Sequence, residues 1–526
     1  MTFMPATCEL PADDDVLRTL VDDLLLDQKK LQTPVARFSE DHERTPSLAS
    51  HYRNLIPLTA PGPGEQYAFE VSLDRCTSCK SCVAACHSLN GLDEDESWRD
   101  IGTLVGGADE PKWRQTVTTA CHHCADPGCL TGCPVGAYEK DPNGIVRHLD
   151  DQCIGCSYCL LKCPYDVPKY SKKRGIVRKC DMCHGRLAAG EAPACVQACP
   201  SGAIRIVKRQ VSEIVANGLT GEGFLKGAPS PRTTRPATRY IGRRIPETAR
   251  AADLEKLVLQ DTHWPLVIML TLTQAGLGLL IAAAFMKSHV VAIAGAAVFF
   301  SGMAASVLHL GRPLGAWRFF LGLRTSWLSR EILAFLLIAP LAAVLPVWPW
   351  LAAFLPGPWL ATTEKFLAPS LLAISIPAVF TSAMIYVDTH RVSWRLTISA
   401  PRFFGTLMVF AGLGWAIAAP STLTLTLAAV AIVAKIIPES RFLRDYGDPD
   451  TSWSPDQHTA QLMLMRVMSP VTHGRFGTAI AAIIALMFSP WTAAALMLLS
   501  EMLERIGFFR TVYAPKMPGE AGRCTR

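Results

Sequence analysis

The sequence lacks several features that would mark a self-contained enzyme. Its 526 residues contain no nucleophile motif, no phosphate-binding loop and no dinucleotide-binding fingerprint. The formal net charge of +6 is mild, and basic and aromatic residues do not alternate as they do in nucleic-acid-binding modules. Residues 1–11 lack the basic start and apolar core of a secretory signal peptide. We therefore expect the substrate chemistry on another chain, no nucleic-acid partner, and an N-terminal half that stays in the cytoplasm.

Cysteine and long apolar runs are plentiful, and they divide the chain into two unlike halves. Hydrophobic residues make up 50% of the chain, and the cysteines number 18. Residues 1–260 hold nearly all of the cysteines and most of the charge, whereas the rest is dominated by long apolar stretches. The composition predicts a cysteine-rich domain followed by a membrane-embedded one.

Sixteen cysteines between Cys76 and Cys199 fall into four groups of four. The groups are Cys76, Cys79, Cys82 and Cys86; Cys121, Cys124, Cys129 and Cys133; Cys153, Cys156, Cys159 and Cys163; and Cys180, Cys183, Cys195 and Cys199. The first and third groups have the spacing C-x2-C-x2-C-x3-C of bacterial ferredoxins, and the other two lengthen the middle spacer. Proline follows the last cysteine in three groups, and His87 takes its place in the first.

Three kinds of chemistry compete for these cysteines. Disulfides suit short secreted chains in an oxidising compartment. Structural zinc prefers two well-separated pairs of ligands, and four closely spaced cysteines suit it poorly. Iron–sulfur clusters take four thiolates each, and a C-x2-C-x2-C loop supplies three of them from one short segment. The complete fourfold repeat favours clusters, and the fourth cysteine of each run typically serves the other cluster of a pair. Spacing alone does not decide which groups pair.

Residues 70–205 resemble the four-cluster electron-transfer subunit of molybdopterin oxidoreductases, as in the dimethyl sulfoxide reductase family. The resemblance implies that the first group pairs with the fourth and the second with the third. The four ligand sets would then be Cys76, Cys79, Cys82 and Cys199; Cys180, Cys183, Cys195 and Cys86; Cys121, Cys124, Cys129 and Cys163; and Cys153, Cys156, Cys159 and Cys133. Some relatives replace one ligand of the third group and hold a three-iron cluster. Because Cys156 is present here, four [4Fe–4S] clusters are expected.

The expected fold is an α+β tandem bacterial-ferredoxin-like domain with four [4Fe–4S] clusters, fused to an all-α membrane bundle of about eight transmembrane helices. We expect an N-terminal extension over 1–66, with an amphipathic helix at Asp13–Leu31. The cluster domain would span 67–210, a connector 211–262, the membrane anchor 263–510 and a cytoplasmic tail 511–526. The expected helices are Trp264–Met286, Val290–Leu308, Ile332–Val347, Phe366–Val387, Phe403–Ala419, Thr422–Ile437, Phe476–Phe488 and Thr492–Phe508.

Basic residues gather on one side of these helices. That side carries Arg243, Arg244, Arg250, Lys256, Arg312, Arg318, Arg324, Arg330, Arg391, Arg395, Arg402, Arg441, Arg444, Arg466, Arg475, Arg505, Arg510 and Lys516. The opposite side has only Lys287 and Lys365. By the positive-inside rule, the sequence predicts a multi-pass protein of the bacterial inner membrane, with the iron–sulfur domain and both termini cytoplasmic.

The stretch from His309 to Arg318, followed by Ser326 to Leu333, resembles the membrane anchor of dimethyl sulfoxide reductase. The resemblance implies that the two family subunits are fused here and that His309 and Glu331 carry a quinol-binding role. A quinol gives up two protons and two electrons; histidine accepts a proton near neutral pH and a carboxylate can relay it. Alternatively, His309 caps a helix and Glu331 pairs with a loop arginine. Arg312 is a further candidate for the quinone oxygen, or only a topology charge.

We therefore expect an electron-transfer and membrane-anchor subunit. Its partners would be the quinone pool (menaquinone or ubiquinone), the lipid bilayer and a separate molybdopterin catalytic subunit. That subunit could be of the dimethyl sulfoxide-reducing or the sulfite-oxidising type. A second hypothesis is a redox-driven ion pump or transporter, which predicts acidic residues in mid-membrane; Glu501 is the main one. Three histidines near helix ends, His309, His390 and His473, leave a bis-histidine haem as a lesser alternative, and no haem is expected.

Overall fold

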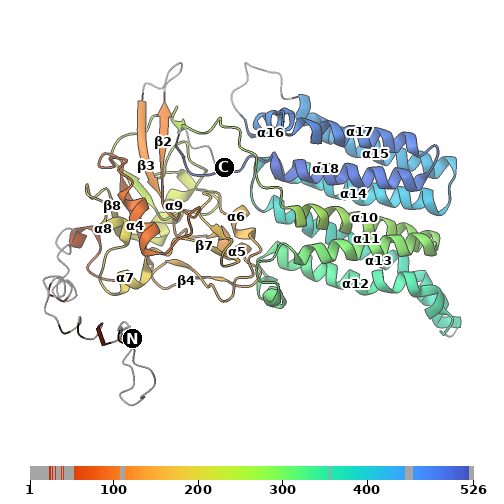
Figure 1. Ribbon diagram of the computed structural model, residues 1–526, viewed down its shortest axis with the longest axis horizontal. Coiled ribbons are helices and arrows are strands. Elements are labelled where there is room, and N and C mark those ends of the chain that lie inside the picture. The colour runs from red at the N-terminus through yellow and green to blue at the C-terminus, as the bar shows by residue number, and fades with distance from the viewer. Residues whose placement is uncertain are drawn as a thin grey trace, which may run out of the picture.

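The protein is described by a computed structural model over residues 52–106, 113–354, 357–444 and 454–520, with a few single positions between 20 and 40. The side chains of residues 357–364, 441, 442 and 444 are not described. Most of the helix expected at Asp13–Leu31 therefore lies outside the described residues. The molecule has two halves, a domain of strands and short helices and a bundle of long helices (Figure 1).

The cluster domain is built on a three-stranded sheet with β1 at its centre. Strand β1 (Glu65–Ser72) pairs antiparallel with β8 (Ile204–Gln210) and parallel with β9 (Arg239–Ile241). Seven of the eight β1 residues are buried, because the strand has a neighbour on each edge and is covered on both faces. Since β1 runs into the first cysteine group and β8 follows the last, their pairing brings the two ends of the cysteine-rich region together.

Three smaller sheets complete this half. Strands β2 (Asp100–Gly106) and β3 (Trp113–Thr119) form a hairpin that β10 (Arg250–Ala251) extends. Two short hairpins follow cysteine groups: β4 (Tyr138–Lys140) with β5 (Val146–His148), and β6 (Lys169–Ser171) with β7 (Ile176–Arg178). The short helices are α4 (Ser81–Leu89), α5 (Gly128–Gly132), α6 (Tyr158–Lys162), α7 (His184–Ala188), α8 (Ala194–Gln197) and α9 (Val211–Thr220). A short 3₁₀ helix, η1 (Arg53–Leu55), precedes β1.

The segment expected as a connector, 211–262, contributes α9, β9 and β10 to the cluster domain. The C-terminal segment also returns there, since Thr103 N donates to Gly519 O at 3.1 Å and Lys516 lies 2.7 Å from Asp253. A Cβ added to Gly102 would lie 1.7 Å from Pro518 O, so only glycine admits this close crossing of β2. Both segments thus pack on the domain that precedes the bundle.

The bundle contains a long helix at each of the eight expected places. They are α10 (Trp264–Met286), α11 (His289–Val307), α12 (Trp327–Ala352), α13 (Gly357–Val387), α14 (Leu396–Ala418), α15 (Thr422–Arg444), α17 (Ser469–Ala485) and α18 (Pro490–Arg510). A shorter helix, α16 (Pro455–Leu464), and the 3₁₀ helices η2 (Pro313–Gly322) and η3 (Val392–Trp394) lie in the links between them.

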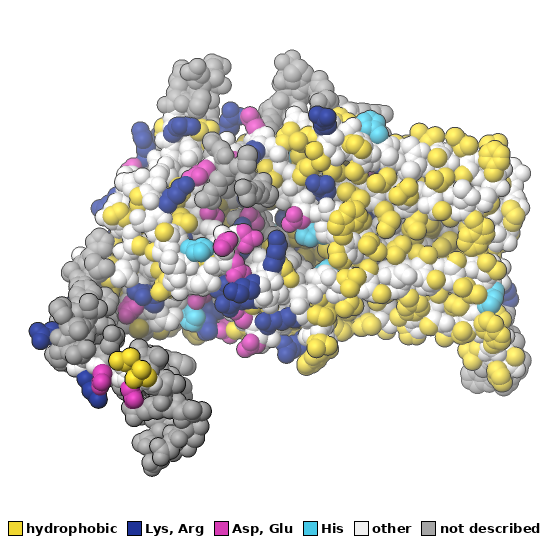
Figure 2. Space-filling model, viewed as in Figure 1, with side chains coloured by type: hydrophobic (Ala, Val, Ile, Leu, Met, Phe, Trp, Pro, Cys, Tyr) yellow, Lys and Arg dark blue, Asp and Glu magenta, His cyan; other side chains and the backbone are white. Residues whose placement is uncertain are grey.

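Six of these helices, α10 to α15, are long and apolar enough to cross a membrane, counting only residues that the structure describes. Helix α17 has 17 residues, and α18 carries several charged ones. Apolar side chains cover the surface of the bundle, whereas charged side chains gather on the other half (Figure 2). The chain is therefore a multi-pass membrane protein, and eight crossings remain a prediction.

Candidate functional site

The first and last cysteine groups meet at one cavity. Cys76, Cys79, Cys82 and Cys199 line it together with Thr118 and Ile204. The β1–β8 pairing explains this meeting, because Val71 lies opposite Ile204, a few residues from the cysteines at either end. These four cysteines are the set that the family resemblance assigns to one cluster.

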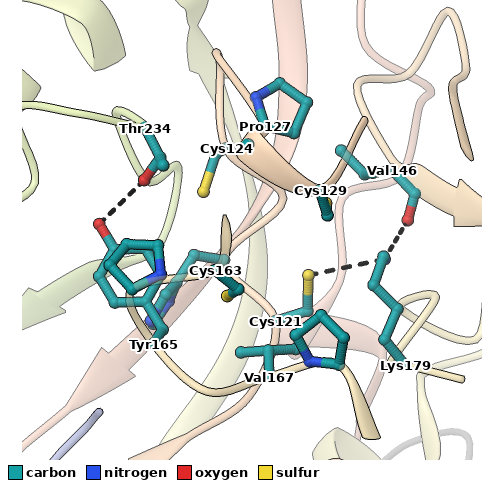
Figure 3. Close-up of a pocket in the computed structure, with 14 residues that line it drawn as sticks. Cys121, Cys124, Pro127, Cys129, Val146, Cys163, Tyr165, Val167, Lys179 and Thr234 are labelled. Carbon is teal, nitrogen blue, oxygen red and sulfur yellow. Dashed lines mark hydrogen bonds between the residues drawn. The ribbon is translucent and has the colours of Figure 1, made fainter. Parts of the chain in front are cut away.

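A second cavity is lined by Cys121, Cys124, Cys129 and Cys163, again one of the expected sets (Figure 3). Beside them, Lys179 Nζ donates to Cys121 Sγ at 3.6 Å and to the carbonyl oxygen of Val146. On the other side, the Thr234 hydroxyl donates to the Tyr165 hydroxyl at 3.1 Å. Cysteines from two different groups thus surround this space.

The other two sets can be recognised from the neighbouring thiols that affect the pKa of each cysteine. Burial raises the pKa of the Cys86 thiol to about 12, and neighbouring Cys195 and Cys183 add to the rise. Burial also raises the pKa of Cys156 to about 12, with Cys133 the first contributing thiol. Cys86 therefore lies with the fourth group and Cys133 with the third. The geometry favours the nested pairing, which stays a prediction.

The backbone of the cysteine loops explains how short segments aim several thiols at one space. Non-glycine residues with left-handed φ occur inside these loops: Ser78, Lys80, His123, Ser157, Met182 and Cys183. Such conformations cost free energy and persist where the surrounding structure enforces them, often at ligand sites. Most of these left-handed residues lie between successive cysteines of one group.

The donor set fits iron–sulfur clusters. Buried thiols with raised pKa values stay protonated until a metal binds them as thiolates. Among the described residues, no three Cys, His, Asp or Glu side chains converge closely enough to hold a single metal ion. In a cubane each thiolate binds a different iron, so the sulfurs lie around a cluster and not around one point. The arrangement suits clusters better than zinc.

Two buried cations lie among the cysteines, and the sequence pattern does not single them out. Arg99 is 2% exposed and donates to the Thr118 hydroxyl at 3.2 Å. Burial opposes the charges of Arg99 and Lys179, but the nearby cysteines, once they are thiolates, outweigh it and raise the pKa of both. For Lys179, Cys121 is the largest such contributor. In the sequence, only its position next to Cys180 could have pointed to Lys179 as a residue of the site. Nothing in the sequence pointed to Arg99.

The third cysteine group lies against the bundle. The Tyr158 hydroxyl, on α6, donates to Ile385 O at 3.0 Å, and Lys162 Nζ lies 2.6 Å from Asp388. On the second group's side, Ser326 Oγ donates to Gly132 O at 2.7 Å. The set Cys153, Cys156, Cys159 and Cys133 is therefore the one held at the membrane junction.

The candidate quinone residues lie near this junction in different surroundings. Glu331, on α12, is 3% exposed and accepts a hydrogen bond from Ser382 of α13. His309 follows α11; its Nδ1 is buried with no hydrogen-bond partner in the described part of the chain. Burial lowers the pKa of His309, so the imidazole is neutral at pH 7. Arg312 instead holds the cluster domain, donating to Asp150 O at 3.0 Å. No direct contact joins His309 to Glu331 within the described residues.

Helices α14, α15, α17 and α18 share a layer of buried charges. Lys435 lies 2.9 Å from Glu501, and Arg475 lies 3.1 Å from both Glu501 and Glu439. The layer continues through Glu504, which contacts Arg402 and Arg505; Arg505 also donates to Gln274 of α10 at 2.7 Å. At 1.5 Å per residue these side chains lie about 8–15 Å from the helix ends nearest the cluster domain.

Fold and site define a ferredoxin-like iron–sulfur protein with a multi-pass membrane region. Residues 113–209 match the family described as 4Fe-4S dicluster domain. The B subunit of anaerobic dimethyl sulfoxide reductase from Haemophilus influenzae is 40% identical over 149 residues, which are 27% of this chain and 73% of that protein. The corresponding subunit of Escherichia coli K12 is 41% identical over 147 residues, 26% of this chain and 72% of that protein.

The iron–sulfur subunit of Escherichia coli nitrate-inducible formate dehydrogenase is 33% identical over 184 residues, 30% of this chain and 61% of that protein. The chain belongs to the family of iron–sulfur electron-transfer subunits that includes the B subunit of dimethyl sulfoxide reductase. The resemblance drawn from the cysteine pattern is thereby confirmed, and the helical region extends the chain beyond the matched residues.

Proposed function

We propose that this chain is the electron-transfer and membrane-anchor subunit of a molybdopterin oxidoreductase complex. It would carry electrons between the quinone pool and a separate catalytic subunit. The observation that carries the proposal is the placement of the Cys133–Cys153–Cys156–Cys159 set at the bundle. Cys79, of another set, is exposed just before α4, which lies on the side of the domain away from the bundle (Figure 1). A chain of redox centres with one end at the membrane suits this task.

When bound, four [4Fe–4S] clusters supply one-electron carriers. The sixteen cysteines hold them, and Arg99 and Lys179 balance part of the negative charge of the thiolates inside the domain. A charge buried without partners would be costly, so these pairs also keep the domain compact around its cysteines.

The quinone site would lie at His309 and Glu331. Oxidation of a quinol to the quinone releases two electrons and two protons. Neutral His309 offers Nδ1 as one proton acceptor, and Glu331, oriented by Ser382, offers a second. Arg312 would act indirectly, by fixing the loop before Cys153 through Asp150. The opposite direction, quinone reduction, uses the same groups in reverse.

The catalytic partner would lie in the cytoplasm of a bacterium, as the arginine distribution predicts for the cluster domain. The matched relatives are named as subunits of dimethyl sulfoxide reductase and formate dehydrogenase. Electrons could accordingly flow from quinol to an S- or N-oxide, or from a substrate such as sulfite to quinone. Identifying the co-purifying catalytic chain decides between them.

The quinone assignment is tested in the anaerobically purified complex. His309→Ala or Glu331→Gln should slow quinol-driven cluster reduction by about 100-fold, because each removes a proton acceptor. Dithionite-reduced cluster signals in electron paramagnetic resonance should stay unchanged. His289→Ala is the matched control, since this histidine lies at the opposite end of α11, bonded to Pro346 O. Unaltered quinol kinetics in both test variants would discard the site.

The buried charge layer favours one second candidate, a redox-coupled ion pump or transporter. The halves of α10, α14, α15, α17 and α18 that face away from the cluster domain carry no charged residue in the sequence. A pump needs a path on both sides, so electron transfer is the better-supported function. Proton release measured in vesicles during quinol oxidation tests the pump: a Glu501-dependent change in proton stoichiometry would support it.

A further inference from the structure

The link between α11 and α12 contains an apolar row that faces away from the protein. Helix η2 (Pro313–Gly322) is a 3₁₀ helix, in which residues three apart lie one above the other. Leu314, Trp317 and Phe320 therefore form one row. They are 94%, 62% and 50% exposed, respectively. Large side chains left this exposed in a row mark a surface with a partner.

The other side of η2 is fixed to the cluster domain. Arg312 N donates to Ile154 O and Gly322 N donates to Pro134 O, both at 3.0 Å. Arg318 Nη1 donates to Asp151 O at 3.0 Å. A Cβ on Gly311 would lie 2.0 Å from Gly175 O, so the chain needs glycine to approach this closely. Helix η2 and the residues just before it are thus hydrogen-bonded to the loops beside Cys133 and Cys153, while the apolar row is exposed.

The position of η2 indicates what covers this row. It joins the end of α11 to the start of α12, two helices with membrane-spanning length and composition, at the junction of the two halves (Figure 1). Val307 and Leu308, at the end of α11 and shortly before η2, are also exposed apolar residues, at 50% and 76%. We therefore expect η2 to lie against the membrane leaflet that is nearest the cluster domain.

The charges around the row match an anionic leaflet. Arginines stand at 312, 318, 324 and 330, and no Asp or Glu occurs from residue 309 to 330. The Arg324 side chain is exposed and contacts no partner in the described part of the chain. Clusters of arginine beside a membrane helix bind anionic lipid headgroups, and tryptophan favours the interface.

We propose that η2 is a phospholipid-binding surface. Leu314, Trp317 and Phe320 enter the acyl region of the leaflet, and Arg324 binds the phosphate of an anionic phospholipid. Helix η2 is also hydrogen-bonded to the loops at Cys133 and Cys153. Bound lipid therefore holds the Cys133–Cys153–Cys156–Cys159 set close to the bilayer, from which a lipid-soluble electron carrier would approach. The lipid site itself does not depend on the quinone assignment.

The first test counts lipids on the full-length protein. Protein purified in mild detergent is supplied with phosphatidylglycerol, and retained lipid is counted by native mass spectrometry. Wild type should keep at least one more phosphatidylglycerol than Arg324→Gln. Arg244→Gln is the matched control, because this arginine is exposed between Arg243 and Ile245, which both contact the cluster domain. Equal retention by wild type and Arg324→Gln would overturn the headgroup site.

The second test separates insertion from charge. Leu314→Ser/Trp317→Ser leaves every arginine in place and removes two members of the row. In nanodiscs of phosphatidylcholine with phosphatidylglycerol, amide hydrogen exchange across residues 313–322 should rise several-fold in this variant relative to wild type. Unchanged exchange would overturn the insertion. Unaltered quinol kinetics in His309→Ala and Glu331→Gln, with normal lipid retention, would count against the quinone site alone, so the two proposals fail separately.

Discussion

Buried cations beside the cysteines set the electrostatic surroundings of this domain. Lys179 is 3% exposed and bonds to Cys121 Sγ, Cys180 O and Val146 O. It lies between the second and fourth cysteine groups, which the nested pairing assigns to different clusters. A single ammonium therefore acts on two ligand sets. Its hydrogen bonds to two carbonyls keep it in place when neighbouring charges change.

We predict that Lys179→Gln makes the reduction potential of at least one cluster more negative, by tens of millivolts. Reduction adds negative charge, and removal of a nearby cation disfavours it. Redox titration followed by electron paramagnetic resonance measures the shift. Lys172→Gln serves as the control, because this lysine is exposed on the β6–β7 hairpin. Identical potentials in wild type and Lys179→Gln would show that the cation has no electrostatic role.

At the scale of elements, α6 and α13 hold the two halves together. Lys162 has 8% of its side chain exposed and Asp388 has 24%, so their ion pair is largely sheltered from water. Tyr158, one turn earlier on α6, bonds to Ile385 and Asp388. Since α13 also carries Ser382, the partner of Glu331, this contact links the third cysteine group to the candidate quinone residue.

Asp388→Asn should destabilise this junction by about 2 kcal/mol, because it leaves the Lys162 ammonium in a sheltered position without its carboxylate. The thermal midpoint in detergent should fall, and quinol-driven cluster reduction should slow. The comparison is Glu191→Gln, which breaks the more exposed Arg186–Glu191 pair and should change stability by less than about 1 kcal/mol. Equal effects of the two substitutions would contradict a special role for the junction.

The buried charge layer binds α14, α15, α17 and α18 into one unit. Glu501→Gln should cost about 3–5 kcal/mol, since Lys435 and Arg475 would each lose a carboxylate partner in an apolar region. The double variant Lys435→Met/Glu501→Leu should recover part of the loss, because one cation leaves with the anion. Folded yield and thermal midpoint are the measurements. A double variant less stable than Glu501→Gln would argue against simple charge pairing.

At the scale of the whole molecule, local patterns predicted the elements but not the contacts between them. Cysteine spacing identified the four groups, and apolar runs located the eight long helices, with each end at most nine residues from the expected one. Helix α12 begins at Trp327, five residues before its expected start, because the sequence from Trp327 to Arg330 continues the helix despite its polar members. That extension places Glu331 inside the helix and not at its end.

Contacts between distant segments could not be predicted, because they leave no pattern in the local sequence. Lys162 and Asp388 are 226 residues apart, and the return of Gly519 to β2 spans most of the chain. The charge layer was visible only through Glu501. Its arginines lie near helix ends, where they resemble topology charges, and its partners are divided among α14, α15, α17 and α18. Such partners emerge only when packing brings their helices together.

The nested pairing of cysteine groups is the claim that spans the whole cluster domain. Cys76→Ala/Cys199→Ala should remove one cluster, about four of about sixteen irons, because both cysteines would serve the same cluster. Pairing of neighbouring groups would place them on two clusters, with a loss of about eight. The pairing of β1 with β8 and the cavity shared by these cysteines favour the smaller loss.

Iron analysis and electron paramagnetic resonance of the purified variants distinguish these outcomes. Cys76→Ala/Cys163→Ala provides the reference, because these two cysteines belong to different clusters under either pairing and should cost about eight irons. If both double variants lose the same amount of iron, the nested arrangement is wrong. If only Cys76→Ala/Cys199→Ala keeps about twelve irons, Cys76 and Cys199 serve the same cluster. The central sheet would then have brought the two ends of the cysteine-rich region together.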